Sequence, residues 1–151
     1  MSLKTWQSNG WLRPHQTTAA QLADLLAIVE RDLADAHAKR LSADWQFGIA
    51  YNAALKLCTI LLYAEGYRPE RTLAHYRTLQ ALPLILGDTR KDDADYLDAC
   101  RAKRNTVEYD MAGQASAEEA RELIAFAEQL RADVLAWLRK KHPALFPKPL
   151  A

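Results

Sequence analysis

Apolar residues recur along this chain with the spacing of helices. In the first such stretch the apolar positions lie three, four and seven residues apart, as they do on one face of an amphipathic helix. These positions are Leu22, Leu25, Leu26, Val29 and Leu33. Thr17 or Thr18 precedes them and supplies a hydroxyl that caps a first turn. The pattern therefore predicts a helix that begins next to these threonines.

A second helix is predicted from Ser42 to about Ala64, with Gly66 placed to end it. Apolar residues surround most of this segment, so we expect the helix to lie at the centre of the fold. Trp45 falls on its apolar stripe, and Trp137 falls on another stripe near the end of the chain. Large aromatic rings at such positions are predicted to pack in the core.

Residues 71–86 have the spacing of a third helix. Pro83 is predicted to kink that helix or to restrict its last turn, because proline lacks a backbone N–H. Gly87 is expected to end it. The chain contains no alternating pattern that rivals these helical ones, so no strand is predicted.

Two further helices complete the pattern. Asp92 or Asp93 is expected to cap the fourth, which runs at least to Arg104. Ser116 and Glu119 have the spacing of a capping box and open the last helix.

These elements predict an all-α fold, an up-and-down bundle of about five helices. We interpret the chain as one domain made of an irregular lead-in over 1–17, a bundle over 18–140 and a Pro-rich tail over 141–151. Trp6, Trp11 and Leu12 are expected to dock the lead-in onto the bundle, because exposed clusters of large apolar side chains are unusual.

Composition narrows the function classes. The 151 residues are 50% hydrophobic and 26% charged, and 20 basic residues against 19 acidic ones give a net charge of +1. Such a balance is typical of a globular domain and argues against a strongly electrostatic nucleic-acid binder, although it leaves room for a local basic patch. Cys58 and Cys100 lie in apolar helical segments and are expected to be buried and reduced.

The sequence predicts no metal site and no cofactor. Neither cysteine has a histidine at ligand spacing, and the chain lacks a Gly-rich phosphate loop and a nucleophile elbow. The first residues carry no long apolar run, and the longest apolar stretch is interrupted by Lys56. We therefore expect a cytoplasmic protein without a signal peptide or a membrane span.

The segment from Arg101 to Asp110 has the most unusual concentration of charged and polar residues in the chain. It places three cations in one turn and follows them with Asn105, Glu108 and Tyr109. One interpretation is an ordinary helix end, where cations complement the dipole and Arg104 pairs with Glu108 four residues on. The other is a polar cleft in which the planar guanidinium of Arg104 binds a phosphate.

The same residues resemble the signature of HEPN domains, a family of all-α domains. Its motif is Arg, often followed by Asn, with His after four to six further residues. Arg104 matches the Arg, Asn105 the Asn and Val107 an aliphatic position, and the wider similarity spans about residues 20 to 138. The resemblance implies a homodimer with the motif near its interface. It also implies metal-independent ribonuclease activity of a toxin–antitoxin or defence system, with an antitoxin-type partner protein.

The chain departs from the motif at the histidine. The shortest spacing falls on Tyr109, and the two longer spacings do not meet a histidine either. A tyrosine with a pKa of about 10 is a poor base at neutral pH, whereas histidine titrates near 6.5. We therefore expect no ordinary ribonuclease activity. His75, in the predicted third helix, is the candidate to replace the missing histidine, although a lone histidine there is more often a packing residue.

Three functional hypotheses follow from these residues. The first is a HEPN-like domain that binds RNA, a nucleotide or a partner protein through Arg101, Arg104, Asn105, Glu108 and Tyr109. The second is a metal-independent ribonuclease with Arg104, Tyr109 and His75 as candidate catalytic residues. The third is a helical dimerisation module whose polar motif holds two copies together without binding a ligand.

Overall fold

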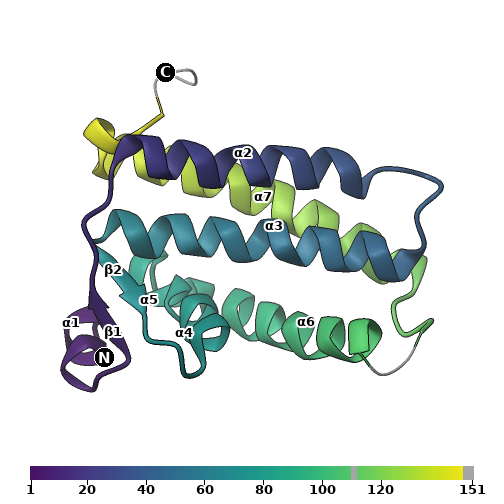
Figure 1. Cartoon of the computed structure of the whole chain (residues 1–151), viewed down its shortest axis with the longest axis horizontal. Coiled ribbons are helices and arrows are strands. Elements are labelled where there is room, and N and C mark those ends of the chain that lie inside the picture. The colour runs from purple at the N-terminus through teal and green to yellow at the C-terminus, as the bar shows by residue number, and fades with distance from the viewer. Residues whose placement is uncertain (110–111, 148–151) are drawn as a thin grey trace.

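The computed structural model describes residues 1–109 and 112–147, and for residues 107–109 it describes the backbone alone. Four long helices form its body (Figure 1): α2 (Ala19–Ala36), α3 (Ala43–Ala64), α6 (Lys91–Tyr109) and α7 (Ala117–Lys141). Each of them runs opposite to the one before it along the chain. The predicted all-α, up-and-down bundle is therefore confirmed.

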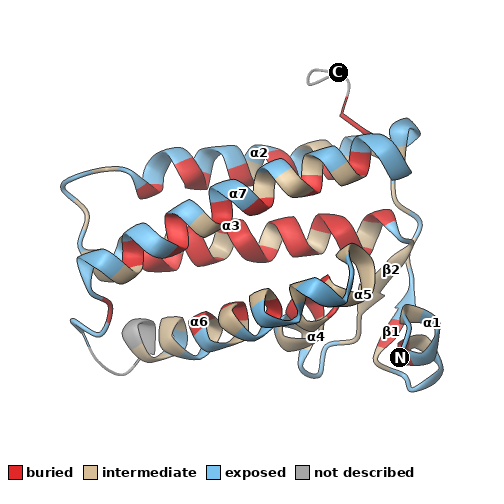
Figure 2. Cartoon of the chain, turned by 180° about the vertical axis from the view of Figure 1, so that it is seen from behind, coloured by how far each residue is buried: buried red, intermediate tan, exposed pale blue. Residues whose placement is uncertain are grey.

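Helix α3 lies at the centre, as its all-round apolar sequence predicts. It packs against α2, α6 and α7, and Figure 2 shows burial along most of its length. Leu57, Leu61 and Leu62 are completely buried, and each such side chain stabilises the fold by about 1.5–3 kcal/mol. In the described part of the chain, α3 alone has the length and composition to cross a membrane. However, 72% of the most apolar 18-residue stretch of α3 is buried inside the bundle, as in the core helix of a globular protein.

Side-chain caps begin three of the long helices where the sequence predicts them. The Thr18 hydroxyl accepts a hydrogen bond from the Gln21 N–H, and the Ser42 hydroxyl accepts one from the Trp45 N–H. Ser116 and Glu119 form the complete capping box. These contacts satisfy backbone donors that a first helical turn leaves unpaired.

The predicted third helix is instead two short helices, α4 (Ala74–Gln80) and α5 (Leu82–Leu86). Pro83 is the second residue of α5 and has no N–H to continue the hydrogen-bond ladder of α4, so the helix breaks before it. Gly87 then adopts a φ of 115° and ends α5.

The predicted cap at Asp92 or Asp93 is wrong. A 3-10 turn, η1 (Asp88–Arg90), leads directly into α6, so both aspartates lie inside its first turn. They still have a physical role there, because carboxylates stabilise the positive end of the helix dipole.

The predicted irregular lead-in contains ordered elements. Helix α1 (Leu3–Ser8) is followed by strand β1 (Leu12–Pro14), which pairs antiparallel with β2 (Tyr67–Pro69). Strands of three residues are too short to show an alternating pattern, which explains why the sequence does not reveal them.

The lead-in docks through its aromatic residues, as expected. Trp6 and Leu12 are buried, and the Trp6 and Trp11 rings meet edge to face with centroids 5.8 Å apart. The guanidinium carbon of Arg77, on α4, lies 3.7 Å from the Trp11 ring centroid. This cation–π contact joins the lead-in to α4.

Trp45 is a further correction, because 61% of it is exposed although its stripe predicts a core position. Helix α3 is apolar on nearly every side, so its sequence periodicity does not predict which face the neighbouring helices leave exposed to solvent. Trp137 is partly buried and packs against the core.

The C-terminal tail contains one 3-10 turn, η2 (Pro143–Leu145). The structure describes this tail up to Pro147, and residues 148–151 lie outside the described part.

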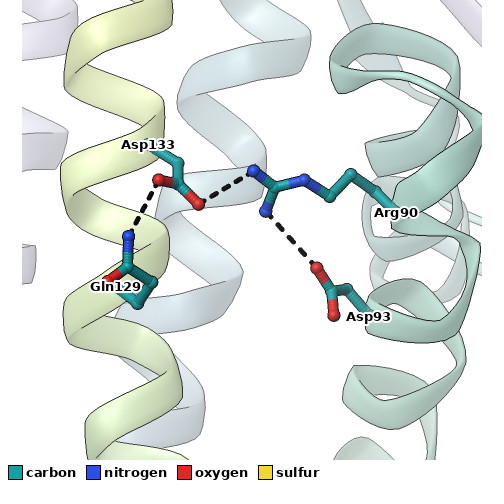
Figure 3. Close-up of polar contacts among 4 residues, drawn as sticks. All are labelled: Arg90, Asp93, Gln129 and Asp133. Carbon is teal, nitrogen blue, oxygen red and sulfur yellow. Dashed lines mark hydrogen bonds and ion pairs between the residues drawn. The ribbon is translucent and has the colours of Figure 1, made fainter.

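One polar network joins the start of α6 to α7 (Figure 3). The Arg90 guanidinium donates to Asp133 on α7 at 2.9 Å and to Asp93 on α6 at 3.4 Å. Gln129 donates to the other oxygen of Asp133 at 3.0 Å. All three charged side chains are two-thirds or more buried, so the network is better shielded from solvent than an ordinary surface pair.

We expect Arg90→Ala to lower the free energy of unfolding by about 1 kcal/mol, because it leaves Asp133 without its charged donor. Urea denaturation measures this change. Lys91→Ala is the matched control, since the Lys91–Asp95 pair is largely exposed and its loss should have no measurable effect. Equal stability of both variants would show that the network contributes nothing.

Candidate functional site

Helix α6 presents the residues of the Arg-Asn motif. Arg101 and Arg104 are half-buried, Arg104 lies over Tyr51 of α3, and Asn105 is exposed. The side chains of Glu108 and Tyr109, which sequence analysis assigns to the same site, lie outside the described part, so the Arg104–Glu108 pair stays a prediction. Lys103 points elsewhere, because its ammonium lies 2.7 Å from Glu119 on α7. The basic run therefore divides between two faces of α6.

His75 joins the motif from a neighbouring helix. Helix α4 packs against α6 and α3, and three cations lie close enough to act on the imidazole. Partial burial lowers the pKa of His75 most, followed by the positive charges of Arg104, Lys56 and Arg101. We call Lys56, His75, Arg101 and Arg104 the Arg104 cluster. It draws side chains from three helices.

One carboxylate partly balances the charge of the Arg104 cluster. The Asp98 carboxylate accepts a hydrogen bond from Arg101 Nε at 2.8 Å, and both side chains are 30% exposed. Lys56, Arg101 and Arg104 bring three positive charges to the cluster, in a chain whose overall charge is close to zero.

Tyr51 of α3 lies beneath the Arg104 cluster and was not identified from the sequence. The guanidinium carbon of Arg104 lies 5.6 Å from the Tyr51 ring centroid, and only 1% of the tyrosine is exposed. Its hydroxyl has no hydrogen-bond partner among the described residues. An unbonded buried hydroxyl costs about 1–3 kcal/mol, so this group is an exception to ordinary core packing.

The charge state of Tyr51 follows from its place. Burial raises its pKa well above the ordinary value, and the charges of Arg104 and Arg101 offset only part of that shift. The hydroxyl therefore keeps its proton and is a donor at physiological pH. In the sequence, Tyr51 cannot be distinguished from a packing residue, because it lies in an apolar helical stretch. Lys56 interrupts that stretch, so its charge can be recognised from the sequence as unusual.

Helix α4 begins at a strained residue. Leu73 precedes it with a φ of 57° and a ψ of 33°, the left-handed conformation, and it is 55% exposed. That conformation costs a residue with a Cβ roughly 1–2 kcal/mol. Leu73 is the N-cap residue of α4, and His75 is the second residue of that helix.

The described residues offer neither a metal site nor a cysteine nucleophile. They contain no group of three or more potential His, Cys, Asp or Glu ligands. Cys58 and Cys100 are buried free thiols, as expected. Burial raises the pKa of Cys58 to about 12 and that of Cys100 to about 11, so neither forms the thiolate that nucleophilic attack requires.

A separate cleft of about 580 Å³ lies between the end of α2 and the start of α7. Its rim includes His37, Lys39 and Arg121, and His37 Nε2 lies 3.2 Å from Glu128. The cleft receives none of the residues of the Arg-Asn motif. The motif and this cleft are therefore independent surfaces.

Comparisons with protein-family models, with curated proteins and with solved structures return no match. The resemblance to HEPN domains therefore stays a prediction that rests on Arg104, Asn105 and Val107. The geometry of the Arg104 cluster is the structural feature that bears on function.

We expect NMR titration to give His75 a pKa below about 6.5, the value of an unperturbed histidine. Arg104→Gln should raise this pKa because it removes the strongest neighbouring charge. Arg40→Gln, at an exposed position in the α2–α3 connection, should leave it unchanged. An ordinary pKa in the wild type, or no response to Arg104→Gln, would contradict the arrangement.

The lowered pKa of His75 in the folded protein has a consequence for the pH dependence of stability. The unfolded chain protonates this histidine at a higher pH than the folded protein does, so acidification below about 6.5 favours the unfolded state. His75→Gln should therefore make stability fall less between pH 7 and pH 5, as measured by urea denaturation at each pH. An unchanged slope would show that His75 titrates alike in both states.

Proposed function

We propose that this chain binds a phosphate-bearing ligand, RNA or a nucleotide, through the Arg104 cluster. The observation that carries the proposal is the convergence of Lys56, His75, Arg101 and Arg104 from three helices. Guanidinium groups bind phosphate oxygens in a planar, bidentate manner, and Lys56 adds a mobile positive charge. Asn105, exposed beside Arg101 on α6, offers amide donors and acceptors.

RNA or a nucleotide is preferred over other anions because of the resemblance to HEPN domains. That resemblance also predicts a homodimer and an antitoxin-type partner. A dimer that is held by the motif itself, without a ligand, is the competing interpretation. Light scattering separates the two interpretations. If the motif only holds a dimer together, Arg104→Ala changes the oligomeric state and there is no ligand binding to be lost.

Metal-independent ribonuclease activity is the second candidate, and His75 is the observation that favours it. A lowered pKa keeps this imidazole neutral at pH 7, which is the protonation state of a general base, and Arg104 lies near enough to stabilise negative charge on a phosphate. The replacement of the motif histidine by Tyr109 argues against the ordinary family mechanism. We therefore place binding first and cleavage second.

We expect Arg104→Ala to weaken binding of a short RNA or of AMP about tenfold or more, because one charge-assisted hydrogen bond contributes about 1.5–3 kcal/mol. Fluorescence anisotropy for RNA and calorimetry for AMP measure the affinities. Arg40→Ala removes an exposed arginine outside the Arg104 cluster and should have little effect. Equal affinity of the wild type and the Arg104 variant, with the fold intact, would overturn the proposal.

Incubation of the purified protein with total RNA in EDTA tests the second candidate. We expect no cleavage by the wild type. Cleavage that is lost in both Arg104→Ala and His75→Gln would instead establish a ribonuclease in which His75 replaces the motif histidine. Cleavage that survives in both variants would indicate a contaminating nuclease.

A further inference from the structure

The cleft of about 580 Å³ between α2 and α7, which we call the α2–α7 cleft, is formed where three helices meet. Its lining comes from the end of α2 and the connection after it, from the start of α3 and from the first half of α7. These segments lie at the same end of the bundle, on the right in Figure 1. A cleft of this size is in the range of sites that bind small molecules.

Hydrogen bonds hold both connecting segments in place around the α2–α7 cleft. His37 Nε2 lies 3.2 Å from Glu128 Oε2, which joins the end of α2 to α7. The Asp44 carboxylate accepts hydrogen bonds from the Gly113 and Ala115 N–H groups at 2.6 and 3.0 Å, and so it holds the segment that leads into α7. The cleft is therefore already formed without a ligand, and binding does not have to order these segments.

The charged side chains of the lining favour an anion. Lys39 and Arg121 both line the cleft, and within the described part of the chain neither is engaged in an ion pair or a side-chain hydrogen bond. The Glu128 carboxylate, in contrast, already has His37 as its partner. With His37 counted as neutral, two positive charges and one negative charge leave one positive charge, which a monoanion balances.

The rest of the lining favours an aliphatic body on that anion. Ala36 and Ile124, both buried, and Ala125 present aliphatic groups to the cleft. The amide of Gln46, which also lines the cleft, already donates to the Ala38 carbonyl at 3.2 Å. An alkyl chain gains free energy by covering the aliphatic groups, whereas the amide groups of a peptide would lose water without finding a free side-chain amide.

We propose that the α2–α7 cleft binds a free aliphatic monocarboxylate, with its carboxylate against Arg121 and Lys39 and its chain along the apolar lining. The planar guanidinium of Arg121 can donate to both oxygens of a carboxylate, and Lys39 adds a second cation. This cleft shares no residue with the Arg104 cluster. The inference is therefore independent of the proposed function, and each can fail without the other.

Three small probes separate the contributions of the carboxylate and the chain. Octanoate has both, acetate has the carboxylate alone, and octylamine has the same chain length with a positive charge. NMR titration of the full chain should show octanoate shifting the backbone amide signals of residues 36–39 and 117–128. We expect octanoate to bind about tenfold more tightly than acetate, because its chain is buried. Octylamine should bind about tenfold more weakly than octanoate, because it cannot pair with the arginine.

Two variants of α7 place the probe in the cleft. Arg121→Gln should weaken octanoate binding about tenfold, and Arg40→Gln, an exposed arginine outside the lining, is its matched control. Ala125→Glu should abolish binding, because it adds bulk and a negative charge to the lining. Ala132→Glu, at an exposed position of the same helix outside the lining, should have no effect. Both alanines are exposed, so these variants should fold, and their thermal midpoints check this.

The inference fails if octanoate does not bind the wild type. It also fails if octylamine binds as tightly as octanoate, since the cleft would then not select an anion. Equal affinities for acetate and octanoate would show that the apolar lining takes no part. Octanoate binding that persists in folded Ala125→Glu would show adsorption at another surface.

Discussion

Burial of α3 by three neighbouring helices is the constraint on which the rest of the structure depends. Its apolar surface extends around most of the helix, so one partner would leave much of that surface in water. Helices α2, α6 and α7 divide it among them. Small residues at Ala50, Ala53 and Ala54 are buried along with its leucines. An amphipathic stripe on each partner is then sufficient, since each needs to cover only one side of α3.

The candidate site is built into that same packing. Tyr51 and Lys56 belong to α3 itself, while Arg101 and Arg104 come from α6, which packs against it. Polar groups at such a seam are costly unless they are paired or reach solvent. Lys56 and the two arginines are half-buried as whole residues, and the Nε atom of Arg104 is itself buried. Tyr51 is 1% exposed and its hydroxyl is buried, so this group is separated from water.

His75, the third component of the site, lies on the short helix α4. Helix α4 is limited at its end by Pro83 and preceded by Leu73 in the left-handed conformation. The lead-in contacts it through Trp11 and Arg77. Contacts made far away in sequence therefore determine where His75 lies relative to Arg104.

The sequence by itself determined the elements whose causes are local. The capping side chains of Thr18, Ser42 and Ser116 and the stripes that follow them mark three long helices, because capping and periodicity act within a few residues. The Arg-Asn motif is likewise visible from spacing. Tertiary structure alone decided which face of α3 stays open, and so left Trp45 exposed. It also decided the pairing of β1 with β2 and the meeting of His75, Arg104 and Tyr51. These depend on segments distant in sequence, whose relative placement follows from packing and is not encoded by any local pattern.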